Sequence, residues 1–111
     1  MRCSIIYNTY FLPEFLNQLK KYAHLKNLVQ KKINLLALNP YSNCKSELLL
    51  GELKGLRSAR LTKSFRIIFV ICEECKNRNF ARYINCPQKY CNSFSLKTII
   101  FLTFGPHEKI Y

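Results

Sequence analysis

Apolar positions in the first third of the chain recur at helical spacing in two series. The first series consists of Phe11, Leu12, Phe15, Leu16, Leu19 and Tyr22. Asn8-Thr9 provides an N-cap candidate for this helix, and Pro13-Glu14 fits its first turn. The second series predicts a helix to about residue 38, and its members are Leu25, Leu28, Val29, Ile33, Leu36 and Ala37. Asn39-Pro40 ends it, since the residue before proline leaves the helical region. We expect an antiparallel helical hairpin with a buried apolar face.

β-Branched and aromatic residues predict strands at 2–7, 57–63, 65–71 and 98–104. The run at 65–71 is the clearest strand, and we expect 98–104 to be its partner strand in the sheet. Residues 40–56 are loop-like, and the segment between these two strands, 72–97, is a Cys-rich insertion at a hairpin tip. The order β-α-α-β-β-(Cys-rich)-β predicts an α+β fold in a single domain, 1–111. Its antiparallel sheet core carries the helical hairpin on one face.

Composition narrows the classes of function. The 111 residues are 49% hydrophobic, which predicts a packed core. Eighteen Lys and Arg face six acidic residues, all of them Glu, for a formal charge of +12. The lack of Asp removes the usual orienter of a Ser-His-Asp triad and the usual ligands of EF-hands and two-metal nucleases. With three glycines there is no GxGxxG or Walker A loop. Any catalytic reaction in this chain must therefore use Arg, Lys, His, Tyr, Glu or Cys side chains.

The charge predicts a polyanionic partner, because each neutralised phosphate releases counterions. A membrane surface is the competing interpretation, but no run of about 18 apolar residues exists. The N-terminal residues MRCSIIYNTYF make a poor signal peptide. We therefore expect a cytoplasmic protein with no membrane partner. Its six cysteines are then thiols or metal ligands rather than a disulfide framework, hyperthermophile cytosols being the exception.

Five basic residues lead into the clearest strand: Lys54, Arg57, Arg60, Lys63 and Arg66. On strands, 60 and 66 share a face, as do 57 and 63, so a hairpin would present several cations together. A solvated basic face is the simpler interpretation. Arg66 favours a binding site instead, because a cation inside an apolar strand is costly unless it meets a ligand or a carboxylate.

The run 53–69, LKGLRSARLTKSFRIIF, resembles the central signature of the RelE/ParE toxin superfamily. That signature is Leu-x-Gly, then basic strand residues, then aromatic-Arg-hydrophobic-hydrophobic-aromatic. The closing residues 105–111, GPHEKIY, are similar to the family's terminal Gly-His-x-x-x-Val-Tyr element. Leu-Asn-Pro at 38–40, after the helical hairpin, also fits. The resemblance covers 1–71 and 98–111 with the elements in the same order, and it implies the RelE-like fold.

The resemblance also implies a function, that of a RelE/YoeB-like toxin of a type II toxin–antitoxin system. Such a toxin is a metal-independent endoribonuclease (an mRNA interferase) that cuts mRNA on the ribosome and so inhibits translation. The RNA 2′-OH attacks the neighbouring phosphate and leaves a 2′,3′-cyclic end. The implied partners are mRNA, the ribosome and a cognate acidic antitoxin, which would also mask the +12 charge.

The resemblance assigns roles to residues of this chain. Arg66 matches the family Arg that contacts the scissile phosphate, and Arg60 and Lys63 match basic strand residues that hold RNA and stabilise charge. Lys54 and Arg57 extend this RNA-binding surface. His107 matches an Arg or His of the terminal motif and suits a general acid, because a histidine pKa lies near neutrality.

Two further positions complete the implied catalytic set. Glu47 lies where the YoeB-like branch carries its proposed base, with Glu52 and Glu108 as rivals. Tyr111 matches the terminal Tyr, which stacks on or orients a base; covering a core edge is the simpler interpretation.

Two departures from the family pattern keep an alternative open. Pro106 replaces a His common in the family, and Ser58 stands where RelE has a catalytic Lys. The alternative is a non-enzymatic basic module, ParE-like in fold, that binds nucleic acid or a protein target without cutting. His107 and Glu47 favour the nuclease.

The insertion carries a Cys-x2-Cys-x10-Cys-x4-Cys pattern formed by Cys72, Cys75, Cys86 and Cys91. The first pair has the usual spacing of a tetrathiolate zinc knuckle, and the x4 gap is less typical. A hairpin tip has little core of its own, so a metal would organise it. We predict a structural zinc and no catalytic metal, with disulfides and free thiols as alternatives. Cys3 and Cys44 are expected to be packing residues.

Overall fold

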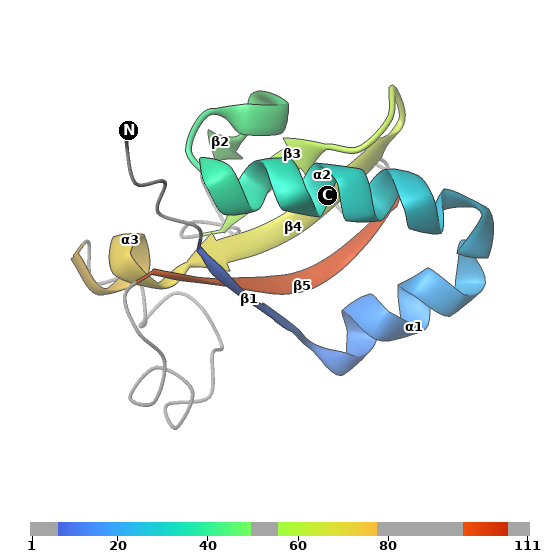
Figure 1. Ribbon diagram of the computed structural model, residues 1–111, viewed down its shortest axis with the longest axis horizontal. Coiled ribbons are helices and arrows are strands. Elements are labelled where there is room, and N and C mark those ends of the chain that lie inside the picture. Colours follow the sequence, from blue (N-terminus) through green and yellow to red (C-terminus); the bar gives the residue numbers. More distant parts are fainter. Residues whose placement is uncertain (1–6, 50–55, 78–96, 107–111) are drawn as a thin grey trace, which may run out of the picture.

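The computed structural model describes residues 7–49, 56–77 and 97–106, with the backbone alone for 75–77. Figure 1 shows how the helices and the strands of the sheet are arranged. The elements are β1 (Asn8–Phe11), α1 (Pro13–Lys21), a 3-10 turn (Ala23–Leu25), α2 (Lys26–Leu38), a second 3-10 turn (Asn43–Lys45), β2 (Glu47–Leu48), β3 (Arg57–Arg60), β4 (Phe65–Ile71), α3 (Cys72–Asn77) and β5 (Thr98–Pro106). The α+β class and the helical hairpin are confirmed. The short helix α3, at the start of the Cys-rich insertion, was not predicted.

The five strands form one sheet in the order β1-β5-β4-β3-β2. The pairs β3–β4 and β4–β5 are antiparallel, as predicted. The pair β2–β3 is antiparallel too, but β2 lies within residues 40–56, where a loop was expected. β1 instead runs parallel to β5. The register places Ile71 of β4 opposite Ile99 of β5. Residues 72–97 therefore link β4 to the adjacent antiparallel strand β5, and the part of this Cys-rich segment from 78 to 96 lies outside the described residues.

The prediction for the start of the chain is wrong in one respect. Asn8 and Thr9 do not cap a helix; they lie in β1, where they pair with Thr98 and Ile99 of β5. The N-cap position of α1 is Leu12, whose side chain makes no capping hydrogen bond, and Pro13 occupies the first turn as expected. Pairing with the long strand β5 outweighs the local capping preference of Asn and Thr. The predicted strand 2–7 lies outside the described residues except for Tyr7.

The strand predicted over 57–63 is shorter than expected and ends at Arg60. Leu61 and Thr62 each donate a backbone hydrogen bond to the carbonyl of Phe65, at 3.0 and 3.3 Å. These bonds close the turn between β3 and β4, so Lys63 lies in the turn and not on a strand. The two strands on either side of this turn hold most of the candidate site.

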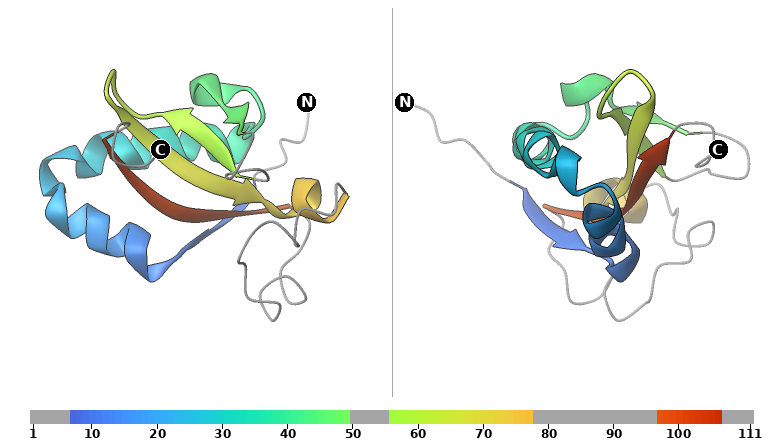
Figure 2. Two further views of the ribbon diagram at one scale, coloured as in Figure 1. Left: turned by 180° about the vertical axis from the view of Figure 1, so that it is seen from behind. Right: turned by 90° about the vertical axis from the view of Figure 1, so that its right-hand side faces the viewer.

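The helices α1 and α2 cover one face of the sheet, as the right-hand view of Figure 2 shows. The core between the layers is apolar, and its fully buried members include Phe15, Leu36, Ile67, Phe69, Phe101 and Phe104. Phe15 of α1 contacts two aromatic rings of β5, those of Phe101 and Phe104, at centroid distances of 5.6 and 5.1 Å. The predicted apolar stripes therefore supply the core face, apart from Leu16, which is exposed. In the described part of the chain, no helix has both the length and the apolar character needed to cross a bilayer.

The other face of the sheet, which we call the distal face, points away from α1 and α2. Side chains alternate between the two faces along each strand. Since Ala59 and Ile67 belong to the helix-side core, their strand neighbours project the other way. By register, the distal face carries Glu47, Ser58, Arg60, Arg66, Ile68 and Thr103.

Candidate functional site

Two guanidinium groups lie opposite each other on the distal face. Arg60 of β3 pairs with Arg66 of β4, which brings their Cβ atoms to about 5 Å. Among the described residues neither arginine has a carboxylate partner, since the ion pairs there are those of Arg57 and Lys97. Like charges directly opposite destabilise a sheet, and an anion between them removes that cost. The predicted pairing of 60 and 66 on one face is confirmed.

The side chain of Arg66 folds over the turn between β3 and β4. Its Nη1 donates to the backbone carbonyls of Thr62 at 3.2 Å, Lys63 at 3.4 Å and Phe65 at 3.2 Å. These contacts engage one nitrogen of a group that carries five N–H donors on three nitrogens. Among the described residues, no acceptor binds Nε or Nη2. Arg66 is thus half-buried, and the carbonyls of the turn orient its guanidinium.

Glu47 lies on the same face as the two arginines. It pairs with Ser58 of β3 and is exposed. Arg60 is two residues further along β3, which makes it a diagonal neighbour of Glu47 on the same face. The ion pairs of the described residues, those of Arg57 and Lys97, do not include Glu47. The acid–base role of Glu47 stays a prediction.

The remaining predicted catalytic and RNA-binding positions are placed as follows. Lys63 lies exposed in the turn beside Arg66. His107, Tyr111 and Lys54 lie outside the described residues, so their roles stay predictions, as do those of the rival bases Glu52 and Glu108.

Arg57 is on the helix side of β3, apart from the other site arginines. Its Nε and Nη2 each donate to a carboxylate oxygen of Glu74 at 2.9 Å, and Nη1 donates to Ser46 Oγ at 3.2 Å. The guanidinium also lies over the ring of Tyr41, 5.1 Å from its centroid. Its donors are thus engaged within the protein. An RNA-binding role of Arg57 stays a prediction.

A second polar cluster surrounds Glu73, the neighbour of Glu74 on α3. Lys97 Nζ lies 2.9 Å from Glu73 Oε1. The hydroxyls of Tyr41 and Tyr7 donate to Oε2 at 2.9 and 3.4 Å. Burial by itself would raise the pKa of Glu73, but the hydrogen bonds from Lys97 and Tyr41 hold it below its usual value. Burial, together with the bond to Glu73, raises the pKa of Tyr41.

Sequence reasoning missed this cluster and the Arg57–Glu74 ion pair. A signal was present, because Glu73 and Glu74 are two of only six acids in a chain of charge +12 and directly follow the clearest strand. The two carboxylates join the base of the insertion to the chain on either side of it. Glu73 binds Lys97 just before β5, and Glu74 binds Arg57 at the start of β3. They are structural anchors of this region.

Breaking the Arg57–Glu74 pair from one side is expected to cost stability. The side chains are 11% and 5% exposed, so Arg57→Ala leaves a buried carboxylate without its partner. We expect the free energy of unfolding to fall by about 3–5 kcal/mol, measured by urea denaturation followed by circular dichroism. The double variant Arg57→Met/Glu74→Leu removes both charges and should recover most of this loss. A loss in the double variant as large as in the single one would contradict the account.

The predicted zinc ligands are described only in part. Cys72 begins α3, is 4% exposed and packs beside Val70 and Ile100. The side chain of Cys75, and all of Cys86 and Cys91, lie outside the described residues. Within the described part of the chain, no cluster of three or more His, Cys, Asp or Glu could hold a metal. Cys44 contacts the main core cluster, as predicted for a packing residue.

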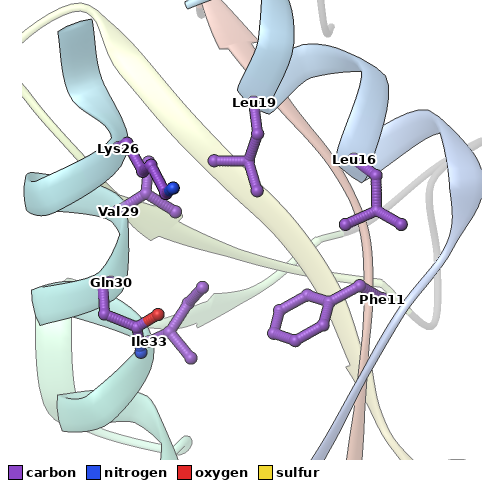
Figure 3. A pocket seen from close by; sticks show the side chains of 7 residues that line it. All are labelled: Phe11, Leu16, Leu19, Lys26, Val29, Gln30 and Ile33. Carbon is purple, nitrogen blue, oxygen red and sulfur yellow. The ribbon is translucent and has the colours of Figure 1, made fainter. Parts of the chain in front are cut away.

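A groove opens between α1, α2 and β1, on the helix side of the protein. Figure 3 shows side chains from the three elements pointing toward a shared space. The groove measures about 110 Å³, and its lining consists of Phe11, Leu16, Leu19, Lys26, Val29, Gln30 and Ile33. A cavity of about 150 Å³ accepts a benzene ring, so this groove has room for one aliphatic side chain. Leu16 beside it is 46% exposed.

The described chain is similar in fold to several solved structures. A YoeB/ParE toxin from Agrobacterium tumefaciens matches with a TM-score of 0.62 at 14% identity, over 90% of this chain and 98% of that chain. A chain of the RelBE2 toxin–antitoxin complex from Mycobacterium tuberculosis matches with a TM-score of 0.62 at 19% identity, over 92% and 99%. YafQ from E. coli matches with a TM-score of 0.61 at 14% identity, over 95% and 98%.

Neither a protein-family model nor a curated protein matches the sequence, so the comparison depends on three-dimensional structure. Each of these toxin chains is matched over 98% or more of its length. The sequence resemblance and the arrangement of helices and strands therefore agree. This chain has the fold of the RelE/ParE toxin superfamily.

Proposed function

We propose that the chain, acting as one domain over 1–111, is the toxin of a toxin–antitoxin pair and an endoribonuclease that cuts mRNA on the ribosome. The fold shared with YoeB/ParE, RelBE2 and YafQ supports the toxin role. The observation that carries the nuclease proposal is the Arg60–Arg66 pair. These two opposed cations lack a carboxylate among the described residues, which is the arrangement a phosphodiester would stabilise.

The reaction would proceed without a metal. The ribose 2′-oxygen forms a bond to the adjacent phosphorus while the bond from phosphorus to the 5′-oxygen breaks. Glu47 accepts the proton of the 2′-OH, and His107 donates a proton to the departing 5′-oxygen. Arg66 and Arg60 stabilise the charge that gathers on the phosphorane oxygens, and Lys63 contributes to the same field. Lys54 extends the RNA contact, and Tyr111 stacks on a base.

The decisive experiment is a cleavage assay with the purified chain on ribosomes programmed with mRNA. Mapping of 5′ ends should show defined cuts, and the upstream fragments should carry 2′,3′-cyclic phosphates. Lys31→Ala, which removes an exposed cation from α2 on the helix side, is the control for loss of net charge alone. If RNA is bound but stays intact on and off the ribosome, the chain is the non-enzymatic binding module and not a nuclease.

We also propose that the antitoxin seats an acidic amphipathic helix in the groove between α1 and α2. The groove is apolar, with Lys26 in its lining. The helical hairpin around it carries five lysines against one acid, the cations being Lys20, Lys21, Lys26, Lys31 and Lys32 and the acid Glu14. An apolar side chain would fill the groove while neighbouring carboxylates pair with the lysines. An antitoxin helix bound in this groove does not cover the distal face, so a second segment of the antitoxin would be needed to cover that face.

Leu16→Glu is expected to weaken antitoxin binding by about 30-fold, because it puts a carboxylate where an apolar anchor belongs. The matched control is Leu38→Glu, at a leucine that is 51% exposed and outside the groove lining. Calorimetry with the co-encoded antitoxin measures the difference. Cleavage by the free toxin should stay unchanged in both variants. Equal affinities for the two variants would contradict docking in this groove.

Zinc remains a proposal for the insertion. We propose that Cys72, Cys75, Cys86 and Cys91 hold one structural zinc per chain, on the strength of the Cys-x2-Cys spacing. The burial of Cys72 at the start of α3 fits a thiolate that holds a metal away from water. Metal analysis of the reduced protein should give one zinc per chain, and Cys86→Ser/Cys91→Ser should lose it. A metal-free chain with oxidised cysteines would establish disulfides instead.

A further inference from the structure

The turn between β3 and β4 forms a seat for the guanidinium of Arg66. Three backbone carbonyls of the turn accept hydrogen bonds from Nη1. They belong to Thr62, Lys63 and Phe65, at 3.2, 3.4 and 3.2 Å. All three belong to the backbone, so the position of the guanidinium depends on how rigidly the turn holds its shape. A loose turn would release a long side chain with several rotatable bonds.

One side chain holds the turn from within. The hydroxyl oxygen Oγ1 of Thr62 accepts backbone hydrogen bonds from Ser64 at 3.3 Å and Phe65 at 3.1 Å. The carbonyl of Phe65 in turn accepts from the backbone of Leu61 and Thr62. A hydroxyl that accepts from the backbone two and three residues ahead is a known way to fix a tight turn. Here it fixes the same segment whose carbonyls bind Arg66.

We propose that Thr62 is a positioning residue for RNA cleavage, which acts by holding Arg66 in the orientation that meets the transition state. This inference rests on the proposed nuclease function and adds a residue to it. Thr62 need not touch RNA. Its hydroxyl orders the carbonyls, the carbonyls orient Nη1, and Nε and Nη2 are left to face the phosphate beside Arg60.

The expected signature is a loss in kcat larger than any change in KM. A released Arg66 still reaches a phosphate in the ground state through other rotamers, so binding is largely kept. The transition state requires one placement, and a displacement of about 1 Å can cost about 100-fold in rate. We expect Thr62→Val, which keeps the β-branched shape and removes the acceptor, to lower kcat by about 10- to 100-fold.

The experiment uses two measurements on the full chain. The first is kcat and KM for cleavage of ribosome-bound mRNA. The second is the ¹⁵N heteronuclear NOE of the Arg66 Nε–H group, assigned by its absence in Arg66→Lys, which reports how rigidly the guanidinium is held. Both kcat and the NOE should fall in Thr62→Val. Both should recover in Thr62→Ser, which restores the hydroxyl, and stay at the wild-type values in Thr9→Val, a control on β1.

The two proposals fail in different ways. A wild-type chain that does not cut mRNA removes the nuclease function, and with it the catalytic role of Thr62. In a wild-type chain that cuts, an unchanged NOE and kcat in Thr62→Val overturn the positioning role alone, as does a Thr62→Ser variant no better than Thr62→Val. Thr62→Ala, checked by circular dichroism, replaces Thr62→Val if the valine does not fit the turn.

Discussion

Replacing Arg66 by alanine is expected to lower mRNA cleavage by about 100- to 1,000-fold, the range found when one preorganised donor to a developing oxyanion is removed. Arg66 should also contribute to RNA affinity, because it meets the phosphate before the reaction as well as during it. Both kcat and KM therefore change. The effect should be large because the guanidinium is already oriented by the carbonyls of the turn.

Two variants distinguish the specific contact of Arg66 with the phosphate from the effect of losing one positive charge. Arg66→Lys keeps the charge but loses the planar fork, and it should recover affinity more than rate. Lys31→Ala removes one positive charge on the helix side and should leave cleavage unchanged. Single-turnover kinetics on programmed ribosomes give both constants. A folded Arg66→Ala protein with full activity would eliminate the proposed phosphate site.

His107→Ala is expected to lower kcat by about 100- to 10,000-fold, the usual contribution of a general acid. Its proton is needed only as the bond to the 5′-oxygen breaks, so the affinity for the substrate should hardly change. The split between kcat and KM therefore distinguishes His107 from Arg66. Measurements of rate and of RNA binding on the same preparation make the comparison direct.

The base is tested in parallel with the acid. Glu47→Gln keeps the shape of the side chain and removes the proton acceptor, and the matched variants Glu52→Gln and Glu108→Gln examine its rivals. The variant that removes the base should lower kcat while RNA binding is kept. Full activity in folded His107→Ala would exclude this histidine from the mechanism. An unchanged kcat in Glu47→Gln would exclude Glu47 as the base.

Most of the fold could be predicted from local patterns. The strand at 65–71 was predicted with its observed bounds, because six of its seven residues are aromatic or β-branched and only Arg66 is charged. Proline marked both the start of α1, at Pro13, and the end of α2, where Pro40 follows the C-cap residue Asn39. The partner of 8–11 could not be found this way, since β1 pairs with a strand about 90 residues away. Long-range pairing overrides a local capping signal, and no window of sequence contains both strands.

The candidate site was predictable to a smaller extent. Strand parity was enough to bring Arg60 and Arg66 together, because both lie on strands that pair directly. The same parity argument predicted that Arg57 and Lys63 share a face of the sheet. Lys63 instead lies in the turn after β3, so strand parity does not apply to it. The role of Arg57 depends on Glu74, a residue on a short helix that no pattern predicted. An ion pair between distant segments is fixed by tertiary structure, so charge spacing alone cannot reveal it.

The position of β5 between β1 and β4 has a consequence for how the protein is made. Translation delivers β1 first, and β5 follows only after the 86 residues from 12 to 97, which takes roughly 4–17 s at about 5–20 residues per second. During that interval β1 has no partner, and β4 lacks the strand that places Gly105 opposite Arg66. A growing chain that holds β1 to β4 and the helices between them therefore still lacks the strand that completes its sheet. The two arginines of the candidate site, on β3 and β4, are thus synthesised before the strand that lies between β4 and β1.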